Sequence, residues 1–256
     1  MGRFESTVGF YDRYREPYPA EFFAEVAGRL GFQGMERLLD IACGPAPLAI
    51  GFAPYVRSAA GVDPEPSMLA AARRLAGEAG VQVELIESRL EDLPVQAGVF
   101  QIATIGRALH WLDREAALPV LERVIVSGGY MLVCGALSIY GPENPWAKAF
   151  HDLRHAWSED PSDRRYRVDV DAWFMDSPFQ KLEEISVTYR QSVALESLIG
   201  RALSMSTTSP AVLGERRAEF EAALRAALEP FAENGILAEE VRARAQVFRR
   251  SPLKID

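Results

Sequence analysis

Cysteine and histidine are scarce in this chain, which has two cysteines and three histidines among 256 residues. Cys43 and Cys134 both stand in apolar, strand-like contexts, which favours reduced core thiols in a cytoplasmic protein over a disulfide. His151 and His155 are four residues apart on an expected helix, a spacing that can bind zinc. Neither a carboxylate pair nor a cysteine clearly accompanies them, so we expect no metal site.

Long apolar runs and basic clusters are also missing. No run approaches the roughly 20 apolar residues that a membrane-spanning helix needs, and the first residues lack the basic-then-apolar order of a secretory signal. Lysine occurs only at positions 148, 181 and 254, and the formal net charge is −8. This charge argues against a nucleic acid or an anionic membrane as the main partner. A small molecule is the expected partner, and the sequence is silent on oligomeric state.

The most informative feature that is present is the segment from Leu38 to Pro47. An apolar strand ends in Asp40, a tight loop of small residues follows, and Pro47 suits the first turn of a helix. A second expected strand ends in Asp63, roughly 20 residues beyond the loop, which is the spacing that places an acid near a ribose in a nucleotide-binding βαβ unit. A helix cap is the alternative role for Asp63. We therefore predict a nucleotide-type site here.

Strands and helices alternate through the first half of the chain. Expected strands end near Ala42 and cover 58–63, 81–86, 99–105 and 130–135, the last after a turn at 127–129, with helices at 20–30, 47–53, 65–78 and 113–126. This alternation predicts parallel strands joined by right-handed crossovers. Ligands of such sheets bind beyond the carboxyl ends of the strands. The segments expected at that edge are 40–46, 63, 90–92 and 106–111.

The pattern changes after residue 135. Residues 136–180 hold three of the four tryptophans and predict a helical insertion. Beyond them we expect a strand over 181–193, helices over 195–206 and 214–231, and a last strand over 241–249. Four parts result: an N-terminal lid and helix (1–30), a core that carries the expected site (31–138), a helical substrate-side insertion (139–180) and a C-terminal completion of the sheet (181–256).

Four parts of the sequence resemble the class I S-adenosylmethionine-dependent methyltransferases, most closely the small-molecule group that includes trans-aconitate methyltransferase. They read YDRYR (11–15) with YP (18–19), LLDIACGPA (38–46), GVDP (61–64) with SML (67–69), and EDLP (91–94) followed by ALHWLD (108–113). The resemblance implies an α/β Rossmann-like fold, with a mostly parallel seven-stranded sheet, helices on both faces and a helical insertion after the fifth strand. It also implies S-adenosylmethionine as cofactor and methyl transfer to a small-molecule acceptor, with a hydroxyl or carboxyl group favoured.

The resemblance further implies which residues hold the methionine part of the cofactor. The loop after the first strand would bring its backbone close to it, through Asp40, Ala42, Cys43, Gly44 and Ala46. The end of the fourth strand would offer a backbone carbonyl to the amino group, from Ile105, Gly106 or Arg107. An N-terminal lid would close over the carboxylate, for which arginine is the natural partner; its residues are Tyr11, Tyr14 and Arg15.

The residues implied around the nucleoside follow the second and third strands. Asp63 would accept both ribose hydroxyls, a bidentate task that suits a carboxylate. Pro64 and Met68 would pack against the adenine ring. The adenine edge would meet the next loop, through the Leu90 N–H and the side chain of Glu91 or Asp92.

Two side chains beyond the fourth strand are the candidate catalytic residues. His110 is placed to act as a general base, since histidine titrates near neutral pH, although transfer to a carboxylate needs no base. Trp111 would wall the acceptor pocket or attract the sulfonium through its ring face. Each has a plainer alternative: His110 shapes the pocket through hydrogen bonds, and Trp111 packs in the core.

Departures from the family's acid-x-Gly-x-Gly-x-Gly loop keep other functions open. Ala42 and Ala46 stand at the first and third glycine positions, and the Cβ of Ala46 restricts both a positive φ and close approach. A non-catalytic S-adenosylmethionine-binding module is therefore one alternative. A nicotinamide-dependent oxidoreductase is the other, although it would need Gly-x-Gly-x-x-Gly, which residues 44–49 do not match.

Overall fold

The computed structural model describes residues 13–158 and 168–252, so Tyr11 lies outside the described part of the chain. The chain divides into two compact units. The core unit comprises residues 18–135, 164–187 and 243–256, and the second unit comprises residues 1–17, 136–163 and 188–242.

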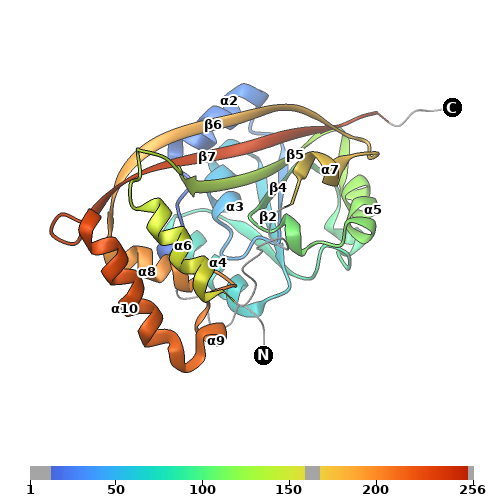
Figure 1. Ribbon diagram of the computed structural model, residues 1–256. Coiled ribbons are helices and arrows are strands. Elements are labelled where there is room, and N and C mark those ends of the chain that lie inside the picture. Colours follow the sequence, from blue (N-terminus) through green and yellow to red (C-terminus); the bar gives the residue numbers. More distant parts are fainter. Residues whose placement is uncertain (1–12, 159–167, 253–256) are drawn as a thin grey trace. The chain divides into compact units, whose positions relative to one another are not determined.

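Seven strands form one sheet with the order β3-β2-β1-β4-β5-β7-β6 (Figure 1). From β3 to β5 every neighbouring pair is parallel, as the alternation of strands and helices predicts. The strands are β1 (Arg37–Ile41), β2 (Ser58–Asp63), β3 (Val83–Glu87), β4 (Phe100–Gly106), β5 (Ile125–Ser138), β6 (Phe179–Ala194) and β7 (Ile236–Arg250). The last three strands each carry residues of both units.

Strands β6 and β7 close the sheet as an antiparallel hairpin. Just after β6, the Leu195 N–H donates to the Gly235 carbonyl just before β7, at 2.9 Å. At the other end, the Ser251 N–H after β7 donates to the Pro178 carbonyl before β6, at 2.8 Å. The seven-stranded, mostly parallel Rossmann-like sheet is therefore confirmed, with its antiparallel pair at one end.

Helices join the strands where the periodicity predicts them. In the first, Phe22, Phe23 and Val26 are buried on one face, and Gly31 ends the helix with a φ of 67°. In the helix before β5, the Asp113 side chain caps the first turn. The helices are α2 (Ala20–Leu30), α3 (Pro47–Phe52), α4 (Pro66–Glu78), α5 (Arg114–Val124), α6 (Ala147–Trp157), α7 (Val170–Phe174), α8 (Leu195–Leu203), α9 (Pro210–Leu213) and α10 (Arg217–Leu228).

The apolar core of the core unit is built on the central strands and on the helices beside them. Strand β4 is almost wholly buried, as a parallel strand covered on both faces requires. Aromatic side chains of α2 and α3 add a cluster, in which the rings of Phe23 and Phe52 meet edge-to-face at 4.9 Å between centroids. Such pairs add roughly 0.5–1.5 kcal/mol beyond the area that they bury. This core fixes the strand ends that carry the candidate site.

The second unit has its own apolar core, built from α6, α8 and α10. Trp146 and Phe150 pack there with Leu198, Phe220 and Leu224, all nearly inaccessible to solvent. The indole N–H of Trp146 is satisfied, because it donates to a backbone carbonyl at the start of β7 at 2.9 Å. The tryptophans at 146 and 157 therefore contribute to packing in this unit.

Two details of the second half differ from the expectation. The predicted turn at 127–129 lies inside β5, where the pairing with β4 shifts between Phe100 and Ile102 and Gly128 has a φ of 77°. Between these paired positions β5 has three more residues than β4, so the glycines form an irregular bulge rather than a turn. The helix expected over 214–231 is shorter, because Gly214–Arg216 forms a 3-10 turn and α10 ends at Leu228.

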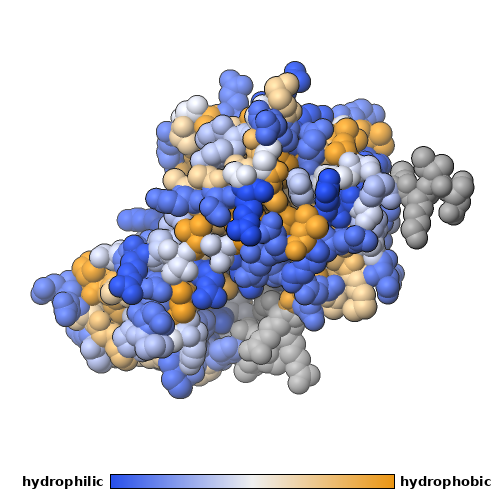
Figure 2. Space-filling model, turned by 90° about the horizontal axis from the view of Figure 1, so that it is seen from above, coloured by the Kyte–Doolittle hydropathy of each residue, from blue (hydrophilic) through white to orange (hydrophobic). Residues whose placement is uncertain are grey.

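The edge strand β6 alternates between buried and exposed side chains. Its exposed positions include Lys181, Glu184 and Arg190, and charged residues of this kind discourage pairing with another strand. Viewed from this side, the surface is polar, with apolar groups in small, separated areas (Figure 2). In the described part of the chain, every helix is too short or too polar to cross a bilayer.

Candidate functional site

The carboxylate of Asp40, near the end of β1, holds the start of α3. Asp40 is 1% exposed; its Oδ2 accepts from the backbone N–H of Ala49 at 3.2 Å, and its Oδ1 accepts from the hydroxyl of Thr104 at 2.8 Å. Ala49 is the third residue of α3, and the N-cap residue Ala46 has no side-chain acceptor. Asp40 therefore supplies from the strand the cap that a serine or aspartate at the N-cap would normally provide.

The carboxylate of Asp63, at the end of β2, connects two loops of the core unit. Its Oδ2 accepts from the Gly44 N–H at 2.8 Å, and its Oδ1 accepts from the Glu65 N–H at 2.9 Å. Glu65 is the N-cap residue of α4, so Asp63 binds the amide of the cap residue and is not itself the helix cap. Each carboxylate oxygen has a second lone pair, so Asp63 keeps the capacity to accept from a ribose. Its ribose role stays a prediction.

Burial raises the pKa of both acids. The pKa of Asp40 rises to about 7, chiefly because the side chain is desolvated; the bonds from Thr104 and Ala49 oppose the rise, and the nearby charge of Asp63 adds to it. Burial likewise raises the pKa of Asp63 against the two backbone bonds that lower it. The Cys43 thiol lies close to both acids, and burial with these charges raises its pKa well above the usual range. Cys43 therefore stays a neutral thiol.

The loop between β1 and α3 uses the left-handed region at every second residue. Ala42 has a φ of 48°, Gly44 of 56° and Ala46 of 59°. Only glycine enters this region without a steric penalty, so the two alanines store strain. The Cβ of Ala46 thus adds a cost, as expected from the sequence, but the loop reaches the positive φ nonetheless.

Close packing fixes the loop from two sides. A Cβ on Gly61 of β2 would lie 2.8 Å from the Cys43 Sγ, so only glycine leaves room to seat that thiol. A Cβ on Gly44 would lie 3.9 Å from the Met68 Sδ, which places the start of α4 beside the loop. Met68 is 4% exposed. The structure therefore brings Cys43, Gly44, Asp63 and Met68 together, as the site prediction requires.

The two acidic candidates in the loop after β3 differ in burial. The side chain of Glu91 is 15% exposed, and its Oε1 is buried with no hydrogen-bond partner among the described residues, whereas Asp92 is exposed. The other oxygen of Glu91 lies 3.4 Å from the Arg89 Nε. Leu90 is buried beside them. A buried acceptor without a donor is costly, so Glu91 is the better candidate of the two for a ligand N–H.

Two residues that the predicted site left out lie against the end of β4. A Cβ on Gly106 would lie 3.0 Å from Leu48 and 3.2 Å from the hydroxyl of Tyr18. The guanidinium of Arg107 lies 5.1 Å from the centroid of the Tyr18 ring, and Arg107 has a φ of 58°. Tyr18 and Leu48 are therefore additional candidates. The Tyr-Pro pair at 18–19 was the available signal for Tyr18, and Leu48 had none.

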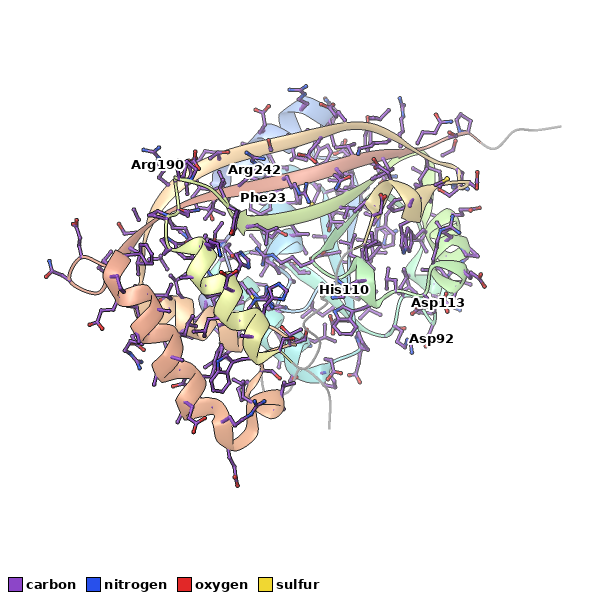
Figure 3. All side chains as sticks on the ribbon, viewed as in Figure 1. Phe23, Asp92, His110, Asp113, Arg190 and Arg242 are labelled. Carbon is purple, nitrogen blue, oxygen red and sulfur yellow. The ribbon has the colours of Figure 1, made fainter. Side chains whose placement is uncertain are left out.

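His110 (Figure 3) shares a single 3-10 turn, Leu109–Trp111, with Trp111, on the connection from β4 to α5. Their rings are 4.8 Å apart between centroids, and both side chains are half-buried. Trp111 also packs against the main apolar cluster of the core unit, which supports its packing alternative. Partial exposure leaves His110 accessible to a ligand, so both of its alternatives stay open.

The two described residues of the predicted lid belong to the second unit. The Tyr14 ring packs on α8, because a Cβ on Gly200 would lie 2.4 Å from it. The backbone carbonyl of Tyr14 accepts from the Arg201 Nε at 2.9 Å, and Arg15 donates to the Ser204 carbonyl at 3.2 Å. Their role toward the cofactor stays a prediction.

The two histidines of α6 also belong to the second unit. His151 packs between aromatic rings, with centroids 5.8 Å from Tyr140 and 5.7 Å from Phe150. Across residues 13–158 and 168–252, no three His, Cys, Asp or Glu side chains are grouped as a metal would need.

Comparison with known proteins finds a family match over part of the core unit. Residues 38–129, from β1 to the first part of β5, match the family described as a methyltransferase domain. Demethylmenaquinone methyltransferase of Thermus thermophilus is 37% identical over 101 residues, which cover 38% of this chain and 46% of that protein. The chain spans about half the length of the curated relatives that it matches.

Solved structures share the fold over nearly the whole chain. A putative type II methyltransferase from Anaeromyxobacter dehalogenans has a TM-score of 0.65 at 20% identity, covering 93% of this chain and 99% of that one. A methyltransferase from Geobacter sulfurreducens, in complex with S-adenosyl-L-homocysteine, has a TM-score of 0.57 at 14% identity, covering 97% and 98%. At such identities the likeness shows the fold.

Proposed function

We propose that this chain, whose residues 38–129 form a methyltransferase domain on a Rossmann-like sheet, transfers the methyl group of S-adenosylmethionine to a small-molecule acceptor. The observation that carries the proposal is the Asp63 carboxylate, which is fixed by the Gly44 and Glu65 amides at the carboxyl edge of the sheet. A pre-oriented carboxylate at this place suits two vicinal hydroxyls of a ribose.

Other residues of the core unit complete the cofactor site in this proposal. The adenine ring packs against Pro64 and Met68, and Glu91 accepts from the exocyclic amine with its buried oxygen. The Leu90 N–H faces the adenine edge. The loop from Ala42 to Ala46 and the carbonyls at the end of β4 hold the methionine part, where Tyr18 and Arg107 add a polar wall.

The bound cofactor supplies an electrophilic methyl group on a sulfonium. The acceptor's lone pair would displace this methyl group from sulfur, which would keep the electrons of the broken carbon–sulfur bond. The chain's residues contribute mainly alignment, and holding two reactants in line can provide several kcal/mol of the barrier, out of the roughly 7–11 kcal/mol seen for ideal intramolecular reactions. His110 takes the proton of a hydroxyl acceptor; a carboxylate acceptor would need no base.

We infer that the acceptor carries a hydroxyl or carboxyl group. Support comes from the half-buried His110 and Trp111, which offer one proton acceptor beside an aromatic wall. One matched relative is named for demethylmenaquinone, so quinone-like compounds belong in an acceptor screen. The formal charge of −8 disfavours a polyanionic acceptor.

Titration calorimetry with S-adenosylhomocysteine, and with NAD as control, tests the cofactor. We expect heat with the first ligand alone; heat with NAD alone would overturn the proposal. Release of S-adenosylhomocysteine across a library of hydroxyl and carboxyl compounds then tests the transfer. Binding without turnover on any acceptor class would leave the non-catalytic module as the function.

A further inference from the structure

Thr104 of β4 lies beside Asp40 of the neighbouring parallel strand β1, in the middle of the sheet. The two residues are register partners in the pairing of β1 with β4. The Thr104 hydroxyl donates to the Asp40 Oδ1 at 2.8 Å, and Thr104 is wholly buried. Neither the loop motif nor the resemblance singles out Thr104. Its hydroxyl and the Ala49 amide are the two donors to this carboxylate among the described residues.

We propose that Thr104 is a positioning residue for the cofactor, because its hydroxyl holds Asp40 as an oriented anion beneath the loop that approaches the sulfonium. The inference rests on the proposed function and deepens it. An anion fixed at this position favours a ligand with a positive sulfur over the neutral thioether left after transfer. Thr104 would therefore improve both loop geometry and the preference for the substrate form of the cofactor.

The charges around Asp40 leave its ionisation sensitive to a single hydrogen bond. Asp63 on β2 raises its pKa, and the thiols of Cys43 and Cys134 lie close enough to be affected by its charge. Arg107, after β4, acts on Cys134 as the nearby cation. With the pKa of Asp40 at about 7, a substantial part of the carboxyl groups is protonated at neutral pH. Because a hydrogen bond to a charged group contributes about 1.5–3 kcal/mol, its loss shifts this balance by about one pH unit or more.

The consequence is a pH-dependent choice between two ligands. As the pH rises through about 7, Asp40 loses its proton and S-adenosylmethionine, with its sulfonium, binds more tightly. S-adenosylhomocysteine lacks that charge, so its affinity rises less with pH. The ligands' own titration is the same for every variant, so comparing the ratio of their dissociation constants between variants isolates the contribution of Asp40.

The test measures both dissociation constants by calorimetry from pH 5.5 to pH 9 in the full chain. Thr104→Val keeps the shape and the strand preference but removes the hydroxyl, whereas Thr104→Ser keeps the hydroxyl. We expect the midpoint of the ratio to move up by about one pH unit in Thr104→Val, with S-adenosylmethionine bound about tenfold more weakly at pH 7. Thr104→Ser should stay within about twofold of the wild type.

A ratio with the same midpoint in Thr104→Val and the wild type would overturn the inference. If Thr104→Val does not fold, Asp40→Asn decides instead: the inference requires that the ratio depends less on pH than in the wild type, and an equal dependence overturns it. Absence of binding by the wild-type chain at any pH would refute the proposed function itself. Binding that is insensitive to Thr104 and Asp40 would refute only this inference.

Discussion

The side chain of Asp63 accepts a 2.8 Å hydrogen bond from the backbone amide of Gly44, nineteen residues earlier in the chain. This bond links the loop after β1 to the end of β2. Its donor lies in the left-handed region, so the amide direction depends on the unusual backbone of the loop. One carboxylate thus fixes two of the segments that the proposed cofactor must touch.

Replacing Asp63 with alanine should weaken S-adenosylhomocysteine binding at least tenfold, or about 1.4 kcal/mol. The variant loses both the acceptor for the ribose and the bond that orients the Gly44 amide. Calorimetry on the folded variant measures the change.

Asp113→Ala is the matched control, because Asp113 also accepts backbone amides at a helix start on this edge of the sheet. Its loss should lower the free energy of unfolding by about 1 kcal/mol and leave the dissociation constant unchanged. Equal dissociation constants for Asp63→Ala and the wild type would refute the ribose role.

The buried carboxyl of Asp40 should make the unliganded chain less stable as the pH rises from about 4 to about 7. Its pKa is 3.8 in the ordinary state and about 7 when folded, so the folded chain holds a proton that the unfolded chain has released. The stabilisation from this group is fully present below pH 3.8 and is lost as the pH rises through about 7.

Urea unfolding of the wild type and of Asp40→Asn, from pH 4 to pH 8, isolates this contribution, because the asparagine does not titrate. Over that interval the free energy of unfolding of the variant should rise relative to that of the wild type by a few kcal/mol, on the order of 1.4 kcal/mol per unit of pKa shift. A difference between the two chains that is constant with pH would show that the Asp40 pKa is not raised.

The strained alanine at the start of α3 gives a prediction with a built-in control. Ala46→Gly relieves a φ of 59° but loses one buried methyl group, so its effect on the free energy of unfolding should stay within about 1 kcal/mol. Ala49→Gly makes the same chemical change inside the helix and should cost about 1–2 kcal/mol. Equal losses would show that Ala46 carries no strain.

The sequence was sufficient for the elements that local patterns define. The apolar runs before Asp40 and Asp63 predict that both acids lie at strand ends, as the structure shows. The number of strands in the sheet came from the resemblance, and the structure confirms the seven-stranded sheet.

Contacts between distant residues were not predictable in the same way. Thr104 lies in a strand of mostly apolar residues, and nothing in the local sequence marks it. Only the register of β1 with β4 reveals its bond to Asp40. The bulge at Gly128 was read as a turn because glycine pairs favour both, and strand pairing decides between them. The choice between Glu91 and Asp92 needed their burial.

His110→Ala should lower turnover by about 10²-fold or more with a hydroxyl acceptor, while the S-adenosylhomocysteine dissociation constant stays unchanged. The reason is that the variant loses the proton acceptor but no proposed cofactor contact. His151→Ala, in the other unit, is the control and should leave turnover unaffected. Turnover by His110→Ala that matches the wild type from pH 6 to pH 9 would assign His110 to packing.

Arg201 of α8 holds two buried carboxylates in the second unit, and its loss should be strongly destabilising. Its Nη1 lies 2.5 Å from Glu239 and 3.4 Å from Glu16, and all three side chains are at most 4% exposed. Arg201→Met would leave two like charges buried without their cation. Removing one member of a buried pair costs about 3–5 kcal/mol.

The exposed pair of Arg225 with Glu196 provides the comparison for Arg201→Met. Its side chains are 43% and 67% exposed, so water screens their 2.8 Å contact. Arg225→Met should change the free energy of unfolding by only about 0.2–1 kcal/mol. Urea unfolding at pH 7 measures both variants; a loss in Arg201→Met as small as in Arg225→Met would mean that the two buried carboxylates do not depend on this cation. The burial of the pair, rather than the presence of an ion pair, is what makes the two arginines differ.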